Sequence, residues 1–176
     1  MYLVVSSSLK GASRSRVLAA EVEKRLRGLT DDVEVLDLMQ VALPFCDGDK
    51  CYENPSVRAV AEQVLRARGI VVATPIYNFD VNAAVKNLVE LTGKAWCDTV
   101  VGFVCAAGGQ GSYMSIMSFA NSLMLDFRTL ILPRFVYATG ESFRGPDLID
   151  GDLQERLDEL ASTLVRLGDV MAVNRE

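Results

Sequence analysis

Short apolar runs alternate with amphipathic stretches along the whole chain. Nearly continuous apolar runs rich in β-branched residues predict buried strands, and a run that alternates apolar and polar positions predicts another. We expect strands at residues 1–6, 33–38, 69–74, 98–107 and 130–138. Pro133 interrupts the last run and predicts a break or a bulge there. Strands that are apolar on both faces are typical of a parallel sheet covered on both sides.

Helical periodicity fills the intervals between these runs. Apolar residues spaced three and four apart predict helices at residues 13–29, 56–68, 81–92, 112–126 and 147–171. Ser56 is the expected N-cap of the second helix. The apolar faces that we expect to point inward include Leu29 in the first helix, Leu65 in the second and Leu148 in the last.

Five strand–helix units follow one another without a repeat or a linker, which predicts one α/β domain over residues 1–176. Right-handed crossovers restrict the topology to doubly wound sheets. We therefore expect a five-stranded parallel sheet in the order 2-1-3-4-5, between two layers of helices. Such sheets bind ligands at the carboxyl ends of their strands, near the switch point between the first and third strands. The loops after these two strands are the places where we expect a site.

The loop after the first strand is rich in hydroxyl and basic side chains. It reads SSSLKGASRSR over residues 6–16 and leads directly into the first helix. A helix N-terminus offers unpaired N–H groups and a partial positive charge, and serines and cations beside it favour a phosphate monoester. The alternative is a polar turn in which Ser13 only caps the helix. The loop matches neither the Walker A pattern nor GxGxxG, which excludes the usual triphosphate and dinucleotide loops.

Aromatic and amide side chains follow the third strand, in ATPIYNFDVNAAVKN over residues 73–87. We expect Pro75 to end this strand, so that Tyr77, Asn78 and Phe79 lie where a flat ligand could cover exposed backbone N–H groups. The alternative is that Tyr77 and Phe79 are core aromatics beside a turn. A glycine-rich loop, AAGGQGS over residues 106–112, ends the fourth strand at the same sheet edge, although glycine runs also serve tight turns.

Composition and charge narrow the classes of function. The chain has 176 residues, of which 50% are hydrophobic and 23% are charged, and its formal net charge is −5. This composition is typical of a folded domain with a sizeable core. We find no basic stripe for nucleic acid, and the apolar runs are shorter than the roughly 18–20 residues of a membrane helix. Because no secretory signal pattern is recognisable, we expect a cytoplasmic protein without nucleic-acid or membrane partners.

Missing residue types exclude several kinds of catalysis. The chain has no histidine, which excludes Ser-His-Asp and Cys-His systems and HExxH metal sites. Its cysteines, at positions 46, 51, 97 and 105, form no CxxC pair, so we expect reduced thiols and no metal site. The sequence indicates no function for Cys46 and Cys51. No catalytic side chain is predicted, and any chemistry must come from carboxylates, lysine, tyrosine, cysteine or a cofactor.

Two motifs at matching spacing carry a family resemblance. SSLKGASRSR over residues 7–16 is similar to a first loop of the form GSxRxxSxNR, and TPIYNFDVNAAVKN over residues 74–87 is similar to TPEYNxSxPGxLKN. With the glycine-rich loop, these segments resemble the NAD(P)H-dependent FMN reductase family of flavodoxin-like flavoproteins, which includes quinone, azo-dye and chromate reductases. The resemblance spans nearly all five units. It implies a flavodoxin-like three-layer sandwich that binds FMN and uses NADPH or NADH.

The resemblance also implies which residues contact the cofactor. The first loop would hold the FMN phosphate through Ser7, Ser8, Lys10, Ser13 and Ser15, with Arg16 as a helper. The isoalloxazine ring would lie beside Pro75, Ile76, Tyr77, Asn78 and Phe79, with Gly108, Gly109 and Gln110 on its other side. The chain departs from the family pattern where Lys10 replaces an arginine, since lysine provides a point charge instead of a bidentate fork. Ile76 stands where the family has an acidic residue.

The activity implied by the resemblance is hydride transfer from NADPH or NADH, through N5 of FMN, to a quinone, a free flavin or a similar small-molecule acceptor. The alternative is a flavodoxin-type electron carrier without enzymatic activity. Such carriers are usually strongly acidic, whereas this chain has a net charge of only −5. A third interpretation is a flavodoxin-like domain that binds no flavin. The resemblance also implies a homodimer or homotetramer, for which residues 112–127 offer an apolar surface rich in methionine and phenylalanine.

Overall fold

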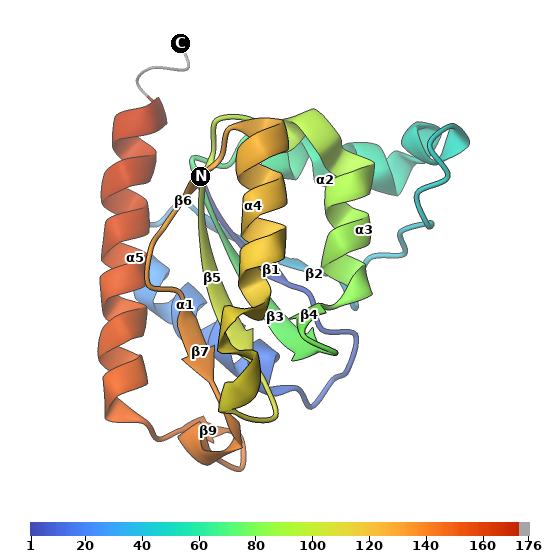
Figure 1. Ribbon diagram of the computed structural model, residues 1–176. Helices are drawn as coiled ribbons and strands as arrows, with labels where there is room; N and C mark the ends of the chain where they lie inside the picture. Colours follow the sequence, from blue (N-terminus) through green and yellow to red (C-terminus); the bar gives the residue numbers. More distant parts are fainter. Residues whose placement is uncertain (173–176) are drawn as a thin grey trace.

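A parallel sheet forms the centre of the molecule, between two layers of helices (Figure 1). The computed structural model describes residues 1–172. The strands follow the order β2-β1-β3-β5, and β6 and β7 both pair with β5 at the edge. They span Tyr2–Ser6 (β1), Val33–Asp37 (β2), Gly69–Tyr77 (β3), Val100–Ala106 (β5), Leu130–Ile131 (β6) and Val136–Ala138 (β7). The expected fourth strand is β5, and β6 and β7 together take the place of the expected fifth. The expected order 2-1-3-4-5 and the flavodoxin-like fold are therefore confirmed.

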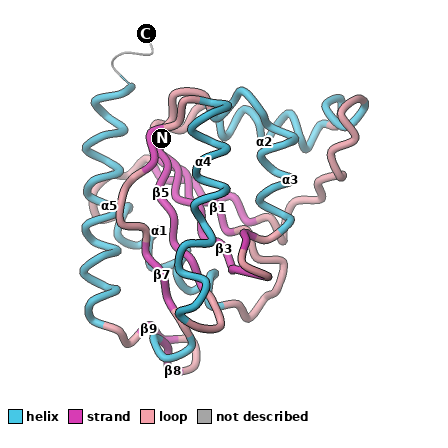
Figure 2. The backbone as a smooth tube through the Cα atoms, viewed as in Figure 1, coloured by secondary structure: helices cyan, strands magenta, loops and turns pink. Residues whose placement is uncertain are grey.

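The helices lie where the periodicity places them, with shifts of a few residues at their ends. They span Arg14–Arg27 (α1), Pro55–Leu65 (α2), Ala83–Thr92 (α3), Ile116–Phe127 (α4) and Gly151–Ala172 (α5). Figure 2 shows α1 and α5 on one face of the sheet and α2, α3 and α4 on the other. Short 3-10 turns occupy Lys50–Glu53 (η1), Gly93–Trp96 (η2), Gln110–Ser115 (η3) and Gly140–Ser142 (η4). Within residues 1–172, no helix combines the length and the hydrophobicity needed to cross a membrane.

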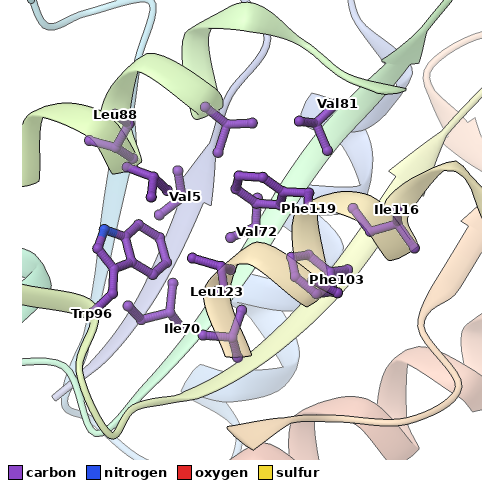
Figure 3. Close-up of a cluster of buried hydrophobic side chains, with 14 of the residues drawn as sticks. Val5, Ile70, Val72, Val81, Leu88, Trp96, Phe103, Ile116, Phe119 and Leu123 are labelled. Atoms are coloured by element: carbon purple, nitrogen blue, oxygen red, sulfur yellow. The ribbon is translucent and has the colours of Figure 1, made fainter. Parts of the chain in front are cut away.

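Each face of the sheet carries its own hydrophobic cluster, because successive side chains of a strand point to opposite faces. On β1, Val4 packs with α1 and α5, whereas Val5 packs with α2, α3 and α4. Figure 3 shows this second cluster, in which Trp96 of η2 and Phe103 of β5 are fully buried among side chains of the sheet and of α3 and α4. The indole N–H of Trp96 donates to Thr92 Oγ1 at 2.7 Å, so its polar atom is satisfied inside the core.

Two details at the helix ends differ from the expectation. Asn54, not Ser56, caps α2, since its side chain accepts the backbone N–H of Ser56 at 2.9 Å. The helix therefore starts at Pro55. A proline is favourable at the first helical position because the N–H of that residue has no partner within the helix. Leu29 and Leu65, expected on inward faces, are exposed because α1 ends at Arg27 and Leu65 is the last residue of α2.

The segment before α5 is a short hairpin, and the prediction that a helix begins at residue 147 is wrong. Strands β8 (Phe143–Arg144) and β9 (Asp147–Leu148) pair antiparallel around Gly145, which has a φ of +61°. The helix begins after Asp150, whose Oδ1 accepts the backbone N–H of Leu153 at 3.2 Å. This hairpin brings its turn to the carboxyl end of the sheet.

The edge strand of the sheet is divided, as Pro133 predicts. Leu132 still donates its backbone N–H to the Val101 carbonyl at 2.8 Å, and the pairing with β5 resumes at Val136. Between them the chain turns through Arg134, which has a φ of +58°. The edge therefore consists of two short paired segments in place of one continuous strand.

Candidate functional site

A pocket of ≈ 910 Å³ lies at the carboxyl ends of β1, β3 and β5, at the expected switch point. This volume is typical of small-molecule sites, which span roughly 300–1,000 Å³. The walls come from the first loop, α1, the end of β3, the segment after β5 and the β8–β9 turn. The lining residues are Lys10, Gly11, Ala12, Ser13, Arg14, Arg16, Val17, Ala20, Pro75, Ile76, Tyr77, Ala106, Ala107, Gly108, Gly145 and Pro146.

The pocket brings together part of the predicted site. The predicted residues that line it are Lys10, Ser13, Arg16, Pro75, Ile76, Tyr77 and Gly108. The predicted residues outside this lining are the buried Ser7, Ser8 and Ser15, and the exposed Asn78, Phe79, Gly109 and Gln110.

Ser7 ties the first loop to the start of α3. It is fully buried, and its hydroxyl donates to Asn82 Oδ1 at 2.8 Å, while Asn82 Nδ2 donates to the Ser7 carbonyl at 2.7 Å. Thr74 Oγ1, at the end of β3, donates to the same Asn82 oxygen at 3.2 Å. These bonds join three segments beneath the site, so Ser7 holds the floor of the loop in position.

The start of α1 forms an anion-binding geometry. Ser13 is the N-cap residue, and its hydroxyl pairs with that of Ser15 at 2.9 Å instead of capping a backbone N–H. The first turn continues with Arg14 and Arg16, so its partial positive charge is reinforced by basic side chains. The exposed Lys10 lines the pocket beside this turn, and its backbone N–H donates to the buried Ser8 Oγ at 3.3 Å.

Arg16 lines the pocket but already has a partner. Its guanidinium forms a two-pronged ion pair with Asp37 at the end of β2, with Nη1 to Oδ1 at 2.7 Å. The hydrogen bond from Arg16 lowers the pKa of Asp37 below its usual value. Because this carboxylate balances the charge of Arg16, the cations that remain for a ligand at this wall are Lys10 and Arg14.

Arg14 is a lining residue that the sequence analysis did not select. Its guanidinium carbon lies 5.9 Å from the centroid of the Phe143 ring, in a cation–π contact with the hairpin before α5. A Cβ added to Gly140 would lie 3.2 Å from Arg14 Nη1, so the glycine leaves room for the guanidinium. No motif marks this position, because its neighbours come from a segment some 130 residues away in the chain.

A tight hairpin forms the opposite wall. The prediction that Pro75 ends the third strand is wrong: β3 continues to Tyr77, and Pro75 pairs in register with Ala106 of β5. The short strand β4 (Asp80–Val81) then folds back on β3. Asn78 and Phe79 form the turn with φ values of +51° and +63°, the conformation of a type I′ turn.

The aromatic side chains of this hairpin face solvent. Tyr77 is 52% exposed and Phe79 is 70% exposed, so the alternative that both are core aromatics is wrong. Positive φ is unfavourable for a phenylalanine, and such strain is concentrated at functional sites. The hairpin therefore presents aromatic surface beside a pocket that has cations on its other side.

The glycine-rich loop is held from below by a tyrosine that the sequence analysis missed. Tyr137 of β7 donates its hydroxyl to the Gly109 carbonyl at 2.6 Å, and Ser112 Oγ lies 2.7 Å from the same hydroxyl. Its ring contacts Tyr113 edge-on, with 5.3 Å between centroids. Gly108 lines the pocket, and the hydrogen bond to the next residue, Gly109, holds this loop in place.

Comparison with known proteins identifies the family of this chain. The profile of the family described as NADPH-dependent FMN reductase matches residues 2–143. The chain belongs to this FMN reductase family. An NAD(P)H-dependent FAD/FMN reductase of Geobacillus thermodenitrificans (strain NG80-2) is 32% identical over 139 residues, which cover 77% of this chain and 75% of the relative. An FMN reductase (NADPH) of Escherichia coli (strain K12) is 26% identical over 127 residues, covering 70% and 64%.

Solved structures share the fold of this FMN reductase family member at low sequence identity. FerB, a flavoenzyme NAD(P)H:(acceptor) oxidoreductase from Paracoccus denitrificans, superposes with a TM-score of 0.79 at 18% identity, covering 97% of each chain. The NADH:FMN oxidoreductase EMOB superposes with a TM-score of 0.75 at 13% identity, covering 93% of this chain and 87% of the other. These matches extend the likeness over the helices and strands described above.

Two departures from the FMN reductase motifs contact each other. Ser7 stands at the first glycine of GSxRxxSxNR, and Asn82 stands at the proline of TPEYNxSxPGxLKN. Their mutual hydrogen bonds couple the two changes, because a serine hydroxyl buried here needs a partner such as the Asn82 amide. Asn82 could have been found from the sequence by comparing the two motifs, since the change at Ser7 in the first is accompanied by the change at Asn82 in the second.

Proposed function

We propose that this chain binds FMN in the pocket and catalyses NAD(P)H-dependent reduction of a small-molecule acceptor such as a quinone or a free flavin. The observation that carries the proposal is one pocket with the positive start of α1 on one wall and the end of β3 on the other. A phosphate suits the first wall, and a flat ring suits the second. Membership of the FMN reductase family supports the same cofactor.

On the phosphate side, the ligands proposed are the N–H groups of the first turn of α1, the Ser13 hydroxyl and the Lys10 ammonium. Arg14 supplies a further cation at the same wall. Ser7 and Ser8 support this loop from beneath, where Ser7 binds Asn82 and Ser8 accepts the N–H of Lys10. Together these groups orient a phosphate monoester at the mouth of the first loop.

On the ring side, Pro75, Ile76 and Tyr77 present the end of β3, and Gly108 approaches from the segment after β5. When bound, FMN supplies the chemistry, accepting hydride from a nicotinamide cofactor and giving it to the acceptor. Pro75 has no backbone N–H, so the donors that would stabilise negative charge on the polar edge of the ring come from Ile76 onward. Among the described residues that line the pocket, none is a carboxylate, and the general-acid types present in the lining are Lys10 and Tyr77.

An assembly is part of the proposal. Exposed apolar side chains lie on the first loop, the β3–β4 hairpin, η3 and α4: Leu9, Tyr77, Phe79, Met114, Met117 and Met124. A patch of this kind marks an interaction surface. We propose a homodimer or homotetramer that buries it, and light scattering after size exclusion measures the assembly mass. A monomeric mass at micromolar concentration rejects this part.

A cytoplasmic location is also proposed, because the cysteines at 46, 51, 97 and 105 are free thiols, as in reducing compartments. The alternative function, a flavodoxin-type electron carrier, is not favoured, since the relatives are named as reductases. Stopped-flow mixing with NADPH separates the two. Rapid bleaching of the flavin absorption supports a reductase, and its absence supports a carrier.

Titration of the FMN-free protein with FMN and with riboflavin, followed by flavin fluorescence, tests the site itself. Lys10→Gln should weaken FMN binding by about 10–100-fold, since a hydrogen bond to a charged group contributes about 1.5–3 kcal/mol. Riboflavin, which has no phosphate, should bind both proteins equally. Lys24→Gln, in the last turn of α1 and outside the pocket lining, is the matched control. Equal FMN affinity in wild type and Lys10→Gln would contradict the proposed phosphate site.

A further inference from the structure

Two thiols face each other in the irregular segment between β2 and α2, outside the pocket. Figure 1 shows this segment extending from the body of the molecule beside α2 and α3. The sulfurs of Cys46 and Cys51 are 4.0 Å apart. Cys51 is buried at 4% exposure in the η1 turn, whereas Cys46 is half-buried. The pair therefore has one thiol that solvent reaches and one beneath it.

The segment that carries the pair is anchored on α3. Asn87 Oδ1 accepts the backbone N–H of Cys46 at 2.9 Å, and Asn87 Nδ2 donates to the Pro44 carbonyl at 2.9 Å. Cys51 packs in a small apolar cluster with Val57 and Leu91. Because both thiols are held by contacts with the body of the protein, their proximity is built into the fold.

The surroundings give the two thiols different characters. The Cys46 sulfur lies 3.5 Å from the Tyr52 hydroxyl and 3.8 Å from the Glu90 carbonyl oxygen, at the surface of the segment. Burial and the neighbouring Asp47 carboxylate raise the pKa of the Cys51 thiol above its usual value. A reagent in solution therefore reaches the Cys46 thiol first. The Cys51 thiol is less accessible and neutral, and it reacts second.

We propose that Cys46 and Cys51 are a redox-active dithiol that closes to an intramolecular disulfide on reaction with a low-molecular-weight disulfide. The Cys46 thiolate attacks one sulfur of the reagent and expels its other half as a thiolate, leaving a mixed disulfide on Cys46. The Cys51 thiol then loses its proton to solvent, attacks the Cys46 sulfur and expels the second half. Two protein thiols and one reagent disulfide become one protein disulfide and two free thiols.

The geometry needs only a short approach. A disulfide bond is about 2.05 Å long, so the two sulfurs must move together by about 2 Å. The four intervening residues include Gly48 with a φ of +75°, in a turn where Asp47 Oδ1 accepts the backbone N–H groups of Asp49 and Cys51. This compact turn keeps both sulfurs on the same side. The inference needs neither FMN nor the proposed reductase activity.

Incubation of the purified chain with oxidised glutathione tests the proposal. Peptide mapping of the wild type should yield a linked peptide that joins Cys46 to Cys51, with no glutathione retained. Cys51→Ser should accumulate one glutathionyl group on Cys46, because no second thiol releases it. In Cys46→Ser, peptide mapping should show Cys51 modified about tenfold more slowly than in the wild type, since the Cys51 thiol is buried.

Cys97→Ser is the matched control, since it removes a half-buried thiol and leaves the pair intact. It should form the Cys46–Cys51 link at the wild-type rate. The peptide map of the wild-type protein tests the proposal even if one of the variants fails to fold. A stable glutathionyl adduct on wild-type Cys46, a link to any other cysteine, or unmodified thiols after prolonged incubation would each overturn the proposal.

Discussion

Replacing Asn82 by alanine should destabilise the protein without touching the pocket lining. The amide joins three segments through bonds of 2.8 and 2.7 Å to Ser7 and 3.2 Å to Thr74. A hydrogen bond contributes about 1 kcal/mol net, and a buried group left unpaired costs about 1–3 kcal/mol. Because Asn82 and both of its partner residues are buried, we expect the free energy of unfolding to fall by about 2–4 kcal/mol.

Urea unfolding of the FMN-free protein measures this change. Trp96 is the only tryptophan of the sequence and is fully buried, so its fluorescence reports the loss of the core. The denaturation midpoint should fall with little change in slope. In thermal unfolding, about 2–4 °C per kcal/mol at this chain length corresponds to a loss of about 4–16 °C.

Variants of the neighbouring residues decide whether the reasoning holds. Ser7→Ala should cost about 1 kcal/mol, and the double variant should cost less than the sum of the single ones, because both remove the same bond. Glu62→Ala, on an exposed position of α2, is the control and should change stability by less than about 0.5 kcal/mol. If Ser7→Ala weakens FMN binding strongly and leaves stability unchanged, Ser7 is a ligand and the scaffold role is refuted.

Other residues of the site allow similar tests. Asp37→Asn should lower stability at pH 7 by about 1–2 kcal/mol. Since the folded-state pKa of Asp37 is lowered, its contribution is present above the unfolded value of about 3.9, so the difference from wild type in acid denaturation should fade below about pH 4. Phe79→Gly should stabilise the FMN-free protein by about 1 kcal/mol in urea unfolding, because glycine relieves the positive φ; a loss would contradict the strain. Gly140→Val should displace Arg14 and weaken FMN binding several-fold at nearly unchanged stability, and unchanged titrations would show that Arg14 takes no part.

The sheet and the position of the site were predictable because they depend on local pattern. Strands buried on both faces read as apolar runs, and their order follows from right-handed crossovers. Lys10 and Ser13 in the first loop and Tyr77 at the end of β3 lie at the edge that this topology predicts, and they do line the pocket. The end of the third strand was predicted wrongly at Pro75. The local rule that proline ends a strand does not take account of the pairing of Pro75 with β5.

What the sequence did not predict depends on contacts between distant segments. Arg16 was expected to help bind phosphate, yet Asp37 lies across from it only once β2 is placed beside β1. The support of Gly109 by Tyr137 likewise requires β7 to pair with β5. No spacing within one motif encodes such partners.

The divided edge strand has a consequence for the behaviour of the protein in concentrated solution. A sheet edge with a long row of unpaired amides is a template on which a strand from another molecule can add, the first step toward fibrils. Here β6 and β7 offer paired runs of only two and three residues, separated by Pro133 and a turn at Arg134. An incoming strand finds no continuous ladder to extend, so this edge resists polymerisation. Filling the break with a straight, β-branched segment would remove that protection.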